Sequence, residues 1–195
     1  MALAYVARFA TTAAKLESYL VRKVRERGFI AGDGGLNAAE TGQNDGEGDA
    51  EAARSFIDGL VARFVERGFV DDEGYARSKS GAMLRQGYGP RRIDVALRHA
   101  GIEESLRSDV DPDEAKVRHA ALALAKKRRF GPYDTSVDPL PGDAGFEQVQ
   151  ARRARQEKQL AAMVRAGHGF DVARAVLEAD TTQAAEEWAH ELDDD

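Results

Sequence analysis

Apolar residues recur at helical spacing along most of the chain. Leu16, Leu20 and Val24 follow one another every four residues, which places them on one face of a helix. Similar stripes follow at Ile57, Leu60, Val61 and Phe64, at Ile93, Ala96, Leu97 and Ala100, and at Val172, Ala175, Val176 and Ala179. Ala, Leu, Arg, Glu and Lys dominate, and β-branched clusters with period-two alternation are absent, so we predict an all-α protein.

Glycine, proline and capping residues divide this pattern into helices. Gly28 and Gly68 each follow Glu-Arg and precede Phe, which is typical of a Schellman-type helix end. Helix starts are predicted at Asp71/Asp72, where an aspartate can cap the helix, and at Gly89-Pro90 and Asp111-Pro112, where proline takes the first helical position. The expected helices cover about 2–9, 11–27, 50–67, 71–86, 89–100, 111–129, 145–166, 170–179 and 183–192.

Two segments are predicted to be non-helical. Residues 31–49 carry six glycines and one large apolar residue, Leu36, so we expect a flexible acidic insert. Residues 132–145 contain three prolines and are expected to form an extended linker. Residues 193–195 are three aspartates and should form a frayed acidic end.

The helices repeat along the chain. A pair of apolar residues four positions apart recurs after 77 and then 79 residues, at Leu16/Leu20, Ile93/Leu97 and Val172/Val176. This period predicts tandem three-helix repeats with helix-turn-helix-like turns in an elongated array. The expected repeats are residues 1–70, which contain the insert, 71–131 and 146–192.

Residues 71–102 are distinctive enough to suggest a family. They contain DDEGYARS at 71–78, LRQGYGPRRI at 84–93 and LRHAGI at 97–102, and FVERGFV at 64–70 precedes them. This sequence resembles the central repeat of the RecX family of bacterial regulatory proteins. A weaker match follows in 146–165 and 169–177, so the resemblance covers most of the chain apart from the two loops and the acidic end.

The resemblance implies a curved, elongated body of three-helix repeats that lies in the groove of a RecA–DNA filament. Such a regulator limits filament extension and damps ATP hydrolysis and strand exchange in recombination, repair and the SOS response. The implied partners are the RecA filament and, additionally, single- or double-stranded DNA. No catalytic residues are known for the family, so we expect no enzymatic activity and no cofactor.

Charge is distributed unevenly along the chain. The net charge is -6, yet residues 31–53 and 176–195 hold fourteen acids and no Lys or Arg. The remainder has 28 basic and 20 acidic residues, a net charge of +8. This asymmetry suits a polyanion partner, although solvated helix faces that lean basic explain it equally well. If residues 176–195 compete with DNA for the basic face, deleting them should raise DNA affinity at low salt.

The candidate binding residues lie on successive predicted helices. They are Arg77, Arg85, Tyr88, Arg91, Arg92 and Arg98, then Lys126, Lys127, Arg128 and Arg129, then Arg152, Arg153 and Arg155. Arg91 and Arg98 are seven residues apart and therefore share a helix face. A solvated face is the more ordinary interpretation of each group alone, but their clustering and the resemblance favour binding.

Other chemistry has little support in the sequence. The absence of cysteine excludes a disulfide scaffold and a thiol nucleophile and makes a reducing cytoplasm the default. The histidines at 99, 119, 168 and 190 lack metal-ligand spacing, and Gly87-x-Gly89 lacks the strand and GK[ST] sequence of a phosphate loop. No apolar run is long enough to span a membrane. We expect a monomer; a direct DNA-binding helix-turn-helix module and a helical scaffold without nucleic acid stay open as alternatives.

Overall fold

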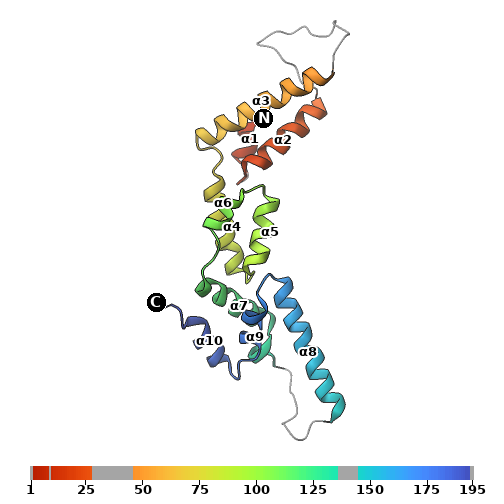
Figure 1. Cartoon of the computed structure of the whole chain (residues 1–195), viewed down its shortest axis with the longest axis vertical. Coiled ribbons are helices and arrows are strands. Elements are labelled where there is room, and N and C mark those ends of the chain that lie inside the picture. Colours follow the sequence, from red (N-terminus) through yellow and green to blue (C-terminus); the bar gives the residue numbers. More distant parts are fainter. Residues whose placement is uncertain (1, 9, 28–45, 136–144, 194–195) are drawn as a thin grey trace. The chain divides into compact units, whose positions relative to one another are not determined.

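The computed structural model describes residues 2–8, 10–27, 46–135 and 145–193. Within these ranges the regular structure is helical and contains no strand, which confirms the all-α prediction (Figure 1). None of the helices in this part of the chain is long and apolar enough to cross a bilayer.

The helices follow the predicted order with two differences. They are α1 (Ala2–Val6), α2 (Ala13–Arg27), α3 (Gly46–Glu66), α4 (Asp72–Arg85), α5 (Pro90–His99), α6 (Glu104–Asp109), α7 (Glu114–Arg128), the 3-10 turn η1 (Gly131–Tyr133), α8 (Phe146–Arg165), α9 (Phe170–Leu177) and α10 (Thr182–His190). The prediction missed α6 and η1, because six and three residues are too few for a periodic pattern.

The predicted flexible insert is partly wrong. Helix α3 begins at Gly46, so residues 46–49 are helical, while the remainder of the insert lies outside the described residues. The prediction started the helix after Gly48, the last glycine of the insert, but glycine only weakens a helix and does not prevent one. In the predicted linker, residues 132 and 133 belong to η1, and residues 136–144 lie outside the described part of the chain.

The chain forms two compact units. Unit 1 contains Met1–Tyr75 and Ala100–Glu103, and unit 2 contains Ala76–His99 and Glu104–Asp195. In unit 1, α2 packs against α3 around Leu16, Phe64 and Val70, all of which are buried. Leu16 and Phe64 belong to the apolar stripes of the sequence, so burial of one face stabilises each of these two helices.

Side-chain caps hold the ends of the unit 1 helices. The Thr12 hydroxyl accepts a hydrogen bond from the Lys15 N–H at 3.3 Å and donates one to the Ala100 carbonyl at 2.5 Å. Asp71 Oδ1 accepts from the Gly74 N–H at 2.9 Å, which confirms the predicted cap of α4. Asp72 instead accepts from the Ala13 N–H at 2.9 Å and therefore caps α2.

The predicted Schellman end is confirmed where the structure describes it. Gly68 has φ +71°, and the Phe69 N–H donates to the Phe64 carbonyl at 2.9 Å. The Gly68 N–H donates to the Val65 carbonyl at 2.9 Å, which completes the motif. The matching Gly28 lies outside the described residues.

Unit 2 has a core of small and branched side chains. Ala121, Leu124 and Ala125 of α7 pack against Met163 of α8 and Val176 of α9. Helix α10 adds Ala185 and Ala189, which pack on Leu122. Alanine on facing helices allows close approach, so α9 and α10 each pack against α7, and α9 also packs against α8 (Figure 1).

Candidate functional site

Two glycine-containing turns meet in unit 2. Gly87-Tyr88-Gly89 joins α4 to α5, and Gly167-His168-Gly169 joins α8 to α9. The Gly89 N–H donates to the Ala166 carbonyl at 2.9 Å, and the Arg91 N–H donates to the Gly167 carbonyl at 3.3 Å. The two turns are therefore joined through their backbones.

Close approach of these backbones requires glycine. A Cβ on Gly89 would lie 2.5 Å from the carbonyl carbon and oxygen of Gly167. A Cβ on Gly167 would collide with the backbone nitrogen of Arg92, and Gly167 has φ +99°. Both the space and the backbone conformation therefore favour glycine at these positions.

The turns serve as a structural joint and not as a phosphate loop. The N–H groups of Gly87, Tyr88 and Gly89 donate to the carbonyls of Leu84, Met83 and Ala166, respectively. A phosphate loop needs such N–H groups to point at the ligand. Their engagement confirms the structural interpretation of Gly87-x-Gly89.

His168 supports this joint from inside. Its side chain is fully buried, and its Nε2 lies 3.0 Å from the Gly87 carbonyl oxygen. Burial lowers the pKa of His168, so the ring is neutral at pH 7 and Nε2–H donates to that carbonyl. No hydrogen-bond partner for Nδ1 is present among the described residues.

A groove of about 400 Å³ lies beside the joint, between the α4–α5 turn and the ends of α7 and α8. Its polar and aromatic walls are formed by Tyr88, Arg92, Lys127, Arg128, Phe130 and Arg165. We call this the basic groove, because four of its lining residues are cations and none of its described lining residues is acidic.

The charge of the basic groove is not neutralised within the described part of the chain. Its four cations form no ion pair there, and the Arg92 guanidinium lies 6.0 Å from the centre of the Tyr88 ring. Exposed guanidinium and ammonium groups bind phosphates or carboxylates, and an aromatic ring adds a stacking surface. The groove can therefore bind an anionic polymer or an acidic protein segment.

The structure brings together only part of the predicted binding set. Tyr88, Arg92, Lys127 and Arg128 line the basic groove. Arg165 also lines it but was missed, because a lone cation at a helix end has no sequence signature. The other predicted residues do not line the groove; these are Arg77, Arg85, Arg91, Arg98, Lys126, Arg129, Arg152, Arg153 and Arg155.

Several of these remaining cations have acidic partners. A guanidinium nitrogen of Arg98 lies 2.7 Å from Asp94 Oδ2, and Lys126 Nζ lies 2.7 Å from Glu186 Oε1. Arg152 and Arg155 line a second cavity of about 460 Å³ in which Asp134, Glu178 and Asp180 also lie. The mixed charge of that cavity makes it a weaker candidate for binding an anion.

Comparison with known proteins gives two relatives. The chain is 29% identical over 181 residues to a regulatory protein RecX of Myxococcus xanthus (strain DK1622). The aligned region covers 91% of this chain and 82% of the relative. It is 31% identical over 90 residues to a regulatory protein RecX of Yersinia enterocolitica. This aligned region covers 46% of this chain and 53% of the relative. No family model matches the chain, and no solved structure matches it.

Both relatives carry the name that the residues 71–102 suggested. The first match extends over nine-tenths of the chain and therefore includes sequence well outside that motif. This similarity confirms the resemblance predicted from the sequence. Over nine-tenths of its length, the chain is therefore similar to a regulatory protein RecX.

Proposed function

We propose that this protein binds RecA nucleoprotein filaments and restrains RecA ATP hydrolysis, filament extension and strand exchange during DNA recombination, repair and the SOS response. The relatives' names support a regulatory role. The basic groove of unit 2 is the observation that carries the proposal, because its cations have no acidic partner among the described residues.

The chemistry of the groove suits such a filament. A nucleoprotein filament carries a dense row of phosphates, and each phosphate neutralised by Lys or Arg releases counterions. Tyr88 and Phe130 supply aromatic surface beside the cations, which suits either an unpaired base or an apolar protein side chain. We also propose that the helices form three repeats arranged in a curved array.

The DNA-dependent ATPase of the cognate RecA tests the proposal. The wild-type protein should lower this activity at substoichiometric ratios, and the double variant Arg92→Ala/Arg165→Ala should lose most of the inhibition. The matched control is Arg91→Ala/Arg98→Ala, which removes the same charge from the exposed face of α5 outside the groove. Unchanged ATPase activity at a stoichiometric excess of the wild-type protein would contradict the proposal.

Direct binding to DNA without RecA is a second candidate function. The same groove favours it, because backbone phosphates alone satisfy four cations. Bare DNA should then bind with an affinity that falls steeply with salt and is independent of RecA. Failure to bind bare DNA at low salt, together with binding to RecA filaments, would exclude it and leave the main proposal intact.

A further inference from the structure

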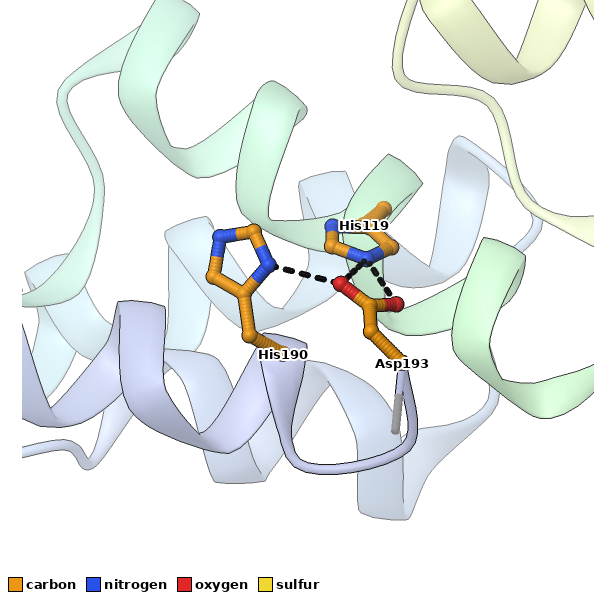
Figure 2. A group of neighbouring side chains, drawn as sticks. All are labelled: His119, His190 and Asp193. Atoms are coloured by element: carbon orange, nitrogen blue, oxygen red, sulfur yellow. Dashed lines mark hydrogen bonds and ion pairs between the residues drawn. The ribbon is translucent and has the colours of Figure 1, made fainter. Parts of the chain in front are cut away.

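Two histidines and an aspartate from distant parts of the sequence meet in unit 2. His119 lies on α7, His190 is the last residue of α10, and Asp193 follows that helix. Figure 2 shows both imidazole rings directed at the Asp193 carboxylate. None of the three residues lines the basic groove, so this His–His–Asp cluster is a separate feature.

The ligand atoms of the cluster are close together. His119 Nε2 lies 2.8 Å from Asp193 Oδ1 and 3.0 Å from Oδ2, and His190 Nδ1 lies 2.8 Å from Oδ2. One nitrogen or oxygen from each residue lies within 4.8 Å of the other two. The two imidazole rings approach edge to face, with centres 4.7 Å apart.

This geometry is close to what a tetrahedral metal needs. Zinc binds imidazole nitrogen and carboxylate oxygen at about 2.0–2.2 Å, so its ligand atoms are about 3.3 Å apart. The nitrogen–oxygen distances of the cluster are 2.8–3.0 Å. Small outward rotations of three partly exposed side chains would make room for the ion.

We propose that His119, His190 and Asp193 form a binding site for a divalent transition-metal ion of the zinc type. Two imidazoles and one carboxylate match the preferences of zinc and its borderline neighbours, whereas Mg²⁺ and Ca²⁺ prefer oxygen ligands. The side chains are 35%, 59% and 42% exposed, respectively. Solvent can therefore reach the ion, and water completes its coordination.

Neighbouring contacts fix the backbone that carries the ligands before an ion binds. Arg118, beside His119, donates to the Trp188 carbonyl at 3.0 Å and to the Glu191 carboxylate at 2.9 Å. The Arg118 guanidinium also lies 4.8 Å from the centre of the Trp188 side-chain ring. These contacts fix the end of α10 on α7, so little ordering entropy opposes metal binding.

A bound ion would cross-link α7 to the end of α10. Because only the folded chain brings these ligands together, the ion would stabilise unit 2 by mass action. The site thus links the stability of the C-terminal helix to the availability of a transition metal.

Zinc titration of the full chain, produced without a polyhistidine tag and freed of metal by chelation, tests this proposal. Calorimetry should show one Zn²⁺ per chain, with a rise in the unfolding temperature and no heat from Mg²⁺. His119→Ala and His190→Ala should each weaken the association constant about tenfold or more. The matched control is His99→Ala, which removes an exposed histidine of α5.

A second measurement keeps the test independent of variant stability. Co²⁺ added to the wild-type protein should give visible absorption typical of low-coordinate nitrogen and oxygen ligation, and Zn²⁺ should displace it. Absence of Zn²⁺ binding by the wild type would overturn the proposal. So would equal binding by His119→Ala and His190→Ala variants whose circular dichroism matches the wild type.

Discussion

Gly89 lies directly against Gly167, and a Cβ on Gly89 would come within 2.5 Å of the Gly167 carbonyl. The Gly89 N–H donates at 2.9 Å to the carbonyl of Ala166, the residue before Gly167. This contact joins the turn before α5 to the turn before α9. It thereby places Tyr88 and Arg165 on the walls of one groove.

Alanine in this joint should destabilise unit 2. Gly89→Ala and Gly167→Ala each force backbone apart, and we expect a loss of about 1–3 kcal/mol in the free energy of unfolding. Gly81→Ala in α4 is the control, because its Cβ would meet only the Arg85 guanidinium, at 3.4 Å. That change should be neutral or stabilise by about 0.5–1 kcal/mol. Urea unfolding followed by fluorescence of the single tryptophan measures all three variants.

Lys127 should contribute to the salt dependence of filament binding. Lys127→Ala removes one cation of the basic groove, so the slope of log affinity against log salt should become shallower by about one. Lys79→Ala, which removes an exposed cation of α4 outside the groove, should leave the slope unchanged. Fluorescence anisotropy with labelled RecA–DNA filaments over a range of KCl concentrations measures both slopes. Equal slopes for the two variants would refute a role for the groove.

The competition of the acidic C-terminal segment with DNA needs a finer test than deletion. Residues 176–195 include the buried Val176, Ala185 and Ala189, so deleting the segment would remove part of the unit 2 core. A point change avoids this. Glu186 lies 2.7 Å from the Lys126 ammonium and accepts a hydrogen bond from Tyr133 at 3.3 Å.

Glu186→Gln should therefore raise the affinity for DNA at low salt, because it frees Lys126 from its acidic partner. Stability should change little, since exposed ion pairs contribute about 0–1 kcal/mol. Glu187→Gln alters the net charge equally, but Glu187 accepts a hydrogen bond from Gln183 instead. Filter binding at low salt separates the two. An equal gain for both variants would indicate a general charge effect and not competition at Lys126.

His168 should make unit 2 less stable in acid. Burial lowers its pKa below the ordinary value of 6.5, so the unfolded chain takes up this proton first as the pH falls. The stability contribution of the neutral ring is complete above pH 6.5 and is lost as the pH falls from there through the folded-state pKa. The change in unfolding free energy cannot exceed about 1.4 kcal/mol per pH unit for one proton.

His168→Gln should flatten this dependence between pH 7 and pH 5, because glutamine can donate to the Gly87 carbonyl but does not titrate in this range. His99→Gln, at an exposed position of α5, should leave it unchanged. Urea unfolding at several pH values provides the measurement. A wild-type profile as flat as that of His168→Gln would show that His168 protonation does not limit stability.

Helices and their ends were predictable because their causes are local. Asp71 and Gly68 act through residues three to five positions away, so their roles can be recognised in the sequence. Helix α6 was missed because it is too short to show a period. The helical start of α3 within the glycine-containing insert was missed because glycine content alone does not decide a helix boundary.

The binding site was only partly predictable because it depends on distant contacts. The run of cations at 126–129 predicted Lys127 and Arg128 as binding residues. Arg165 lines the same groove but was not predicted, because it is isolated in the sequence. The acidic partners of Arg98 and Lys126 also emerged only in three dimensions. Likewise, His119 and His190 have no ligand spacing in the sequence, yet they share one carboxylate in the structure.

The sequence by itself determined an all-helical chain, the main caps and turns, and a family resemblance carried by residues 71–102. Those properties arise from periodic burial and from backbone hydrogen bonds between near neighbours. Only the tertiary structure decided which charges stand together without acidic partners and which histidines meet. Those relationships depend on how α7, α8 and α10 pack, and packing joins side chains whose separation along the chain carries no signal.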